Sequence, residues 1–67
     1  MAKIQKVTKH YDAEASRRRI LAAAVAEFSN YGFHGARIDR IANKAKAIKR
    51  LIYLYFGDKK ELYRRVF

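Results

Sequence analysis

Hydrophobic residues recur at helical spacing along most of this chain. The first apolar stripe repeats every four residues, with neighbours beside it, as one face of an amphipathic helix does. It consists of Ile20, Leu21, Ala24, Val25 and Phe28. Asp12 or Ser16 can cap the start of this helix, and Gly32 can take the positive φ found just past a helix end. The pattern predicts a helix over about 14–31.

Two shorter apolar stripes follow a loop predicted over Phe33–Arg37. The first stripe is Ile38, Ile41, Ala42 and Ala45, and the second is Ile48, Leu51, Ile52, Tyr55 and Phe56. They predict helices over about 37–44 and about 48–56, with only Ala45–Ala47 between them. Because so tight a turn cannot keep two short helices antiparallel, the pair is expected to form a helix-turn-helix.

A fourth helix is expected from Asp58 to Phe67. Gly57 ends the preceding helix, and Asp58 with Glu61 three positions later forms a capping box. Leu62 and Val66 would point inward. The helix stops at an apolar residue without a cap, so we expect the chain to be part of a longer protein.

The composition narrows the range of functions. A chain of 67 residues allows one small domain, and the absence of cysteine excludes disulfides and thiolate metal sites. His10 and His34 lie apart, and no acids have the spacing of a catalytic dyad or a metal site. We therefore expect no enzyme, no metal and no cofactor. No long apolar run or export signal occurs, so we expect a cytoplasmic, nucleoid-associated protein with no membrane partner.

Positive charge is concentrated in the centre of the chain. The formal net charge is +10, and residues 37–50 hold six basic side chains and one acidic one. On a helical wheel, Lys49, Arg50, Tyr53 and Leu54 lie opposite the apolar stripe of the third helix, with Lys46 just before it. Cations and a hydroxyl suit phosphates, and an apolar group suits a thymine methyl. This face is therefore expected to contact DNA.

Residues 17–62 resemble the DNA-binding domain of the tetracycline-repressor (TetR) family. The matching pieces are ILAAAVAEFSNYGF, RIDRIANKA and YLYFGDKKEL, in this order and spacing. The fold class expected is all-α, a three-helix, homeodomain-like helix-turn-helix bundle plus the start of a fourth helix. We divide the chain into a flexible basic arm (1–13), the helix-turn-helix domain (14–57) and the start of helix four (58–67).

The resemblance implies a sequence-specific regulator that binds the major groove of double-stranded DNA, in most members a repressor. It also implies a homodimer and a small-molecule effector, both through a C-terminal domain outside this sequence. The expected DNA-binding residues are Arg37, Lys46, Lys49, Arg50, Tyr53, Leu54 and Lys59. Lys46 stands where the family usually has glycine, which costs about 1 kcal/mol if the position needs positive φ.

Two alternatives compete with this prediction. A small basic RNA-binding protein is the first, but such proteins usually expose aromatic platforms for stacking. Here only Tyr53 and Tyr11 are expected to be exposed. A membrane-active basic peptide is the second, but the first helix has a partner helix to pack against.

Overall fold

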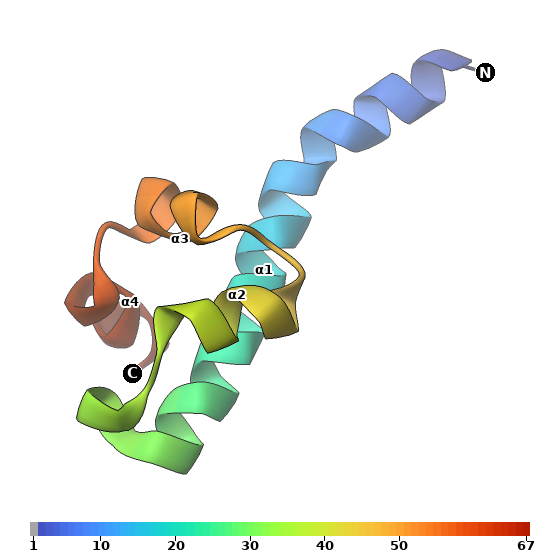
Figure 1. Ribbon diagram of the computed structural model, residues 1–67. Helices are drawn as coiled ribbons and strands as arrows, with labels where there is room; N and C mark the ends of the chain where they lie inside the picture. Colours follow the sequence, from blue (N-terminus) through green and yellow to red (C-terminus); the bar gives the residue numbers. More distant parts are fainter. Residues whose placement is uncertain (1) are drawn as a thin grey trace.

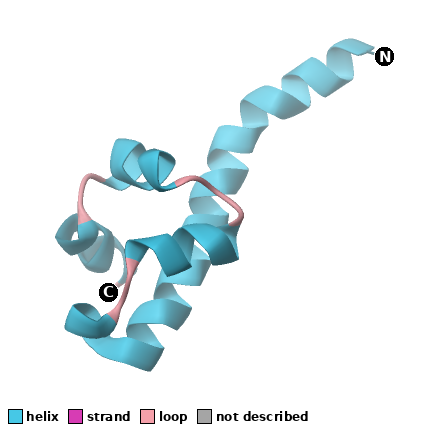
Figure 2. Cartoon of the chain, viewed as in Figure 1, coloured by secondary structure: helices cyan, strands magenta, loops and turns pink. Residues whose placement is uncertain are grey.

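The chain folds into helices connected by very short loops. The computed structural model describes the backbone of residues 2–67 and the side chains of residues 13–67. The helices are α1 (Ala2–Gly35), α2 (Ile38–Ala45), α3 (Lys49–Phe56) and α4 (Lys59–Val66), and no strand occurs within residues 2–67. Figure 1 shows α2, α3 and α4 gathered around the C-terminal half of α1. Figure 2 shows the short loops between them. The predicted all-α helix-turn-helix fold is confirmed.

Helix α1 starts much earlier than the sequence pattern predicted. It begins at Ala2 rather than near 14, so residues 2–13 of the segment expected to be an arm have helical backbone, and neither Asp12 nor Ser16 starts a helix. Ser16 is instead buried and accepts a hydrogen bond from the Arg19 guanidinium at 3.2 Å. The prediction relied on an apolar stripe, which a helix needs only where it packs against a neighbour. The role of residues 1–13 and the division into domains stay predictions.

Gly32 interrupts α1 near its end. Its φ of 75° and ψ of 174° are not helical, and the positive φ agrees with the prediction for this glycine. One further helical turn follows, and the Ala36 N–H then donates to the Gly32 carbonyl at 3.0 Å. The loop expected over Phe33–Arg37 is therefore reduced to its last two residues.

The turn between α2 and α3 depends on a left-handed residue, Lys46, with φ 56° and ψ 46°. Its N–H donates to the Asn43 carbonyl at 3.2 Å, and the next N–H, of Ala47, donates to the Ala42 carbonyl at 2.9 Å. This pair of bonds is a Schellman motif, which satisfies carbonyls left open at a helix end. The turn thus places a non-glycine residue where positive φ is required, and it lies one residue later than predicted.

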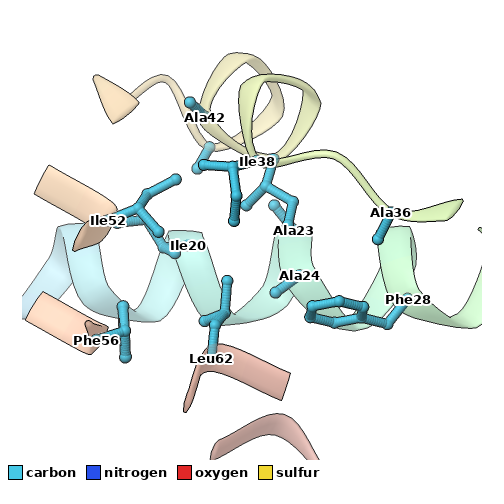
Figure 3. Close-up of a cluster of buried hydrophobic side chains, with 12 residues drawn as sticks. Ile20, Ala23, Ala24, Phe28, Ala36, Ile38, Ala42, Ile52, Phe56 and Leu62 are labelled. Carbon is cyan, nitrogen blue, oxygen red and sulfur yellow. The ribbon is translucent and has the colours of Figure 1, made fainter. Parts of the chain in front are cut away.

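The core lies where α2, α3 and α4 meet α1. Its twelve buried hydrophobic residues are Ile20, Ala23, Ala24, Phe28, Ala36, Ile38, Ile41, Ala42, Ala45, Ile52, Phe56 and Leu62. In Figure 3, Ile52 of α3 lies beside Ile20 of α1, and Leu62 of α4 lies below the same helix. All four apolar positions predicted for α2 are buried. Since alanine is small, the helix backbones can approach closely at these positions.

Two residues predicted on buried stripes are exposed. Val25 is 43% exposed because it lies at the edge of the α1 stripe. Ile48 is 60% exposed because it precedes the first helical residue of α3, in extended backbone, and so does not follow the helical spacing.

Helix α4 begins as the sequence predicted. Gly57 has a φ of 96°, and the Asp58 side chain caps the helix by accepting the Glu61 N–H at 2.9 Å. Leu62 is completely buried, and Val66 is half-buried against the core. The cap and the glycine together fix the direction in which the chain leaves α3.

Candidate nucleic-acid interface

Helix α3 has one face in the core and one face in solvent. Ile52 and Phe56 are 1% and 6% exposed and hold the helix against α1. The residues predicted to face DNA from this helix all lie on the solvent side, as the wheel indicated: Lys49, Arg50, Tyr53 and Leu54. Leu54 is 72% exposed, so an apolar side chain projects from a charged surface.

Lys46 adds a further cation at the start of this surface. Its side chain is exposed, and its backbone is fixed by the two Schellman hydrogen bonds of the turn. Arg19 of α1 also holds this end of α2, because its Nε donates to the Ala45 carbonyl at 3.0 Å. The turn that carries Lys46 is therefore tied to α1 as well as to α2.

Arg37 lies at the beginning of α2, at the other end of that helix. Its backbone N–H donates to the Glu27 carboxylate at 3.0 Å, while its exposed guanidinium reaches Asp39 at 3.4 Å. The structure therefore fixes the backbone of Arg37 firmly and leaves its side chain in an exposed, weak ion pair.

Lys59 lies at the start of α4 and already has a role inside the fold. Its Nζ donates to the Ala36 carbonyl at 2.9 Å and lies 4.9 Å from the centre of the Phe33 ring. The side chain is half-buried. An ammonium has three protons, so a phosphate contact stays compatible with these two interactions. The contact itself stays a prediction.

Asp39 is the acid that lies among these cations. Hydrogen bonding from its own backbone N–H, together with the charges of Arg37 and Lys49, holds the pKa of Asp39 below its ordinary value. Its carboxylate thus stays ionised at neutral pH and reduces the positive potential near the start of α3.

Sequence reasoning missed three residues that organise this surface: Arg19, Glu27 and Arg40. Glu27 is 6% exposed, and its Oε2 accepts from Arg40 Nε at 2.7 Å as well as from Arg37. A signal for it was present, because Glu27 is the one charged residue between residues 20 and 36. An acid that lies next to the apolar stripe of a helix and is followed by several arginines indicates a buried ion pair.

The exposed aromatic residues differ from the prediction. Tyr53 is exposed as expected, but Phe67, Tyr31 and Tyr63 are exposed too, by 67%, 53% and 37%. The Arg40 guanidinium lies 4.3 Å from the centre of the Tyr31 ring, and Tyr63 packs edge-on against Phe28 at 5.0 Å. These two rings already have partners in the fold, and Tyr11 lies outside the described side chains.

Within the described part of the chain, no helix has the length and hydropathy needed to cross a membrane. Likewise, residues 13–67 contain no group of three or more histidine or acidic side chains that could hold a metal ion.

Comparison with known proteins identifies the family. Residues 20–66 match the family described as bacterial regulatory proteins, tetR family. The chain is 58% identical over 55 residues to the HTH-type transcriptional repressor SCO4008 of Streptomyces coelicolor, covering 82% of this chain and 29% of that protein. It is 49% identical over 51 residues to the HTH-type transcriptional repressor NicS of Pseudomonas putida, covering 76% of this chain and 24% of that one.

A solved structure agrees in fold. The crystal structure of the putative transcriptional regulator SCO4942 from Streptomyces coelicolor superposes with a TM-score of 0.75 at 49% identity. The superposition covers 76% of this chain and 28% of that one. The chain thus spans about a third or less of the length of these relatives. It belongs to the TetR family of bacterial regulatory proteins.

Proposed function

We propose that this domain binds double-stranded DNA by placing α3 in the major groove. The observation that carries the proposal is the two-sided character of α3. Ile52 and Phe56 anchor the helix in the core, and the opposite face presents cations, a tyrosine hydroxyl and an exposed leucine. A helix held in this way and exposed along one side is the element that fits the width of a major groove.

The residues of the surface divide by the chemistry they offer. Lys49, Arg50 and Leu54 would contact base edges, since a guanidinium can bind guanine with two hydrogen bonds and an apolar group can pack on a thymine methyl. The remaining predicted residues would hold backbone phosphates, which position a protein on the duplex without reading its sequence. These are Arg37, Lys46, Tyr53 and Lys59.

We further propose that the domain serves a ligand-responsive repressor that acts as a homodimer. The proteins SCO4008 and NicS are named as transcriptional repressors, and each is more than three times as long as the segment that matches. Two linked domains that read half-sites about one helical turn apart gain affinity through their connection. A domain of this size on its own is expected to bind weakly and with strong salt dependence.

Fluorescence anisotropy tests the proposal. The chain is titrated against a mixed-sequence DNA duplex and a single-stranded RNA of equal length, at two salt concentrations. A preference for the duplex that falls steeply with salt supports the proposal, and equal or tighter RNA binding contradicts it.

A variant then tests the role of α3 itself. Arg50→Ala removes an exposed guanidinium from the solvent face and is expected to relax the preference at one base pair by about 1–3 kcal/mol. Arg64→Ala on α4, also exposed, is the matched control. If both variants bind like the parent, α3 does not read DNA.

A further inference from the structure

Arg17 belongs to α1 but lies beside α3. The Arg17 guanidinium lies over the ring of Tyr55, with its central carbon 5.0 Å from the ring centre. This distance is within the range of a cation–π contact. Arg17 therefore bridges α1 and α3, one turn before Ile20, which packs beside Ile52 in the core (Figure 3).

The Tyr55 ring places Arg17 next to the proposed DNA-binding face. Tyr55 directly follows Leu54, the most exposed large hydrophobic residue among residues 13–67, and is itself half-buried on the flank of α3. On a helical wheel, Tyr55 lies between the buried face and Leu54. A guanidinium held there continues the basic surface around this flank of the helix.

Within residues 13–67, most of the hydrogen-bonding capacity of Arg17 is unused. It has no carboxylate within ion-pair distance among residues 13–67, and its one hydrogen bond there is a long contact of 3.5 Å to the Ala13 carbonyl. The next residue differs, because Arg18 pairs with Glu14 at 3.9 Å. A guanidinium has five N–H donors in a planar fork that matches phosphate geometry. Arg17 is thus held over the Tyr55 ring, and most of its N–H donors make no hydrogen bond within residues 13–67.

Arg17 is also far from Lys59, another of the proposed phosphate-binding residues. Lys59 lies over Phe33, just beyond the interruption at Gly32, and the regular stretch of α1 from Arg17 to Tyr31 alone corresponds to roughly 21 Å at the rise of an α-helix. The two side chains therefore cannot share one phosphate, so their contributions are expected to add.

We infer that Arg17 is a further phosphate-binding residue, held over Tyr55 so that its edge meets the DNA backbone beside α3. The inference rests on the proposed function, because it needs α3 in the groove. It adds α1 to the elements that touch DNA.

The salt dependence of duplex binding tests this inference. Arg17→Gln is expected to weaken binding to all duplexes alike and to reduce the slope of log affinity against log salt by about one. The ratio of the parent's duplex affinity to that of the variant then falls roughly three- to fourfold between about 50 and about 200 mM salt. Arg18→Gln, the matched control with the same charge change, is expected to keep most of the slope.

A second pair of variants tests the support by the ring. Tyr55→Phe keeps the aromatic face and is expected to bind like the parent. Tyr55→Leu removes it and is expected to lower the slope as Arg17→Gln does, while circular dichroism shows the same helicity.

The outcomes separate the two proposals. If Arg50→Ala weakens binding while Arg17→Gln matches Arg18→Gln, the inference is wrong and the proposed function stands. If the parent chain shows no preference for duplex DNA, both are overturned. If Tyr55→Leu keeps the parent's slope of log affinity against log salt, the Tyr55 ring does not hold Arg17 in its binding position.

Discussion

Arg40 of α2 donates from Nε to the Glu27 Oε2 of α1 at 2.7 Å, and this carboxylate is almost completely buried. The same oxygen accepts the backbone N–H of Arg37, the residue before α2. Arg40 also donates to the Gly35 carbonyl at 3.2 Å. One carboxylate therefore connects α1 to the start and the first turn of α2, and so sets the angle at which the helix-turn-helix leaves α1.

Glu27→Gln tests this connection. We expect a loss of about 1–3 kcal/mol in the free energy of unfolding, because a buried acceptor of two donors loses its charge and one partner is left poorly satisfied. Urea unfolding followed by circular dichroism measures it. Glu14→Gln, in an exposed pair on the same helix, is expected to stay within about 0.5 kcal/mol of the parent. Equal effects of the two substitutions would contradict the role given to Glu27.

Lys46 is expected to lower the stability of the fold and to strengthen binding to duplex DNA. Lys46→Gly relieves the left-handed backbone and should raise stability by about 1 kcal/mol. The same change removes a cation and should weaken duplex binding. Lys46→Ala is the control, because it removes the charge and keeps the strain. We expect both variants to bind equally weakly and only the glycine variant to melt at a higher temperature. Equal melting temperatures would mean that the turn relaxes without glycine.

Asp39 is expected to affect behaviour in acid. Because folding lowers the pKa of this carboxyl, Asp39 stabilises the folded state above the ordinary aspartate pKa. That contribution is lost as the pH falls through the lowered value. Asp39→Asn should therefore flatten the decline of stability in acid, and it should strengthen duplex binding at neutral pH by removing a negative charge. An NMR titration of the carboxyl carbon checks the pKa, and a midpoint above the ordinary value would contradict this account.

Leu54 is expected to contribute to binding and not to stability. Its side chain is 72% exposed, so Leu54→Ala should change the free energy of unfolding by less than about 0.5 kcal/mol. On a selected operator we expect several-fold weaker binding, with the loss confined to one thymine. Replacing that thymine by deoxyuridine removes the methyl group. A double-mutant cycle that combines this replacement with Leu54→Ala then measures the coupling energy between the side chain and the methyl group. Fully additive losses would show that Leu54 does not touch the methyl.

Lys59→Ala should affect both properties. Loss of the bond to the Ala36 carbonyl is expected to lower stability by about 1 kcal/mol. Loss of the charge should weaken all duplexes alike and lower the salt slope by about one. Lys60→Ala, the exposed neighbour, is the control for charge alone. Binding of the Lys59 variant with the parent slope would remove Lys59 from the interface.

Local patterns predicted the parts of the fold that depend on local physics. The α2 stripe, the positive φ of Gly32 and the Asp58 cap were all predicted correctly, because each depends on residues within one or two turns. The beginning of α1 was wrong, since its N-terminal turns carry no core stripe. The exposed face of α3 was predicted from spacing alone and is confirmed.

The spacing of residues along the sequence did not predict the interactions between helices. Glu27 pairs with residues ten and thirteen positions away, and Lys59 reaches a carbonyl twenty-three positions away. Nothing in the spacing of charges specifies such partners, because they depend on how the helices pack. For the same reason, no local spacing indicates that Arg17 lies over the Tyr55 ring.

The residues that anchor α3 in the core are different from the most exposed residues of its solvent face. Ile52 and Phe56 hold the helix, whereas Lys49, Arg50 and Leu54 make no contribution to the buried core. If α3 reads DNA as we propose, substitutions at those three positions change the preferred operator while the buried core that holds the fold stays the same. Under that proposal, duplicated copies of such a gene can acquire new target sites one residue at a time.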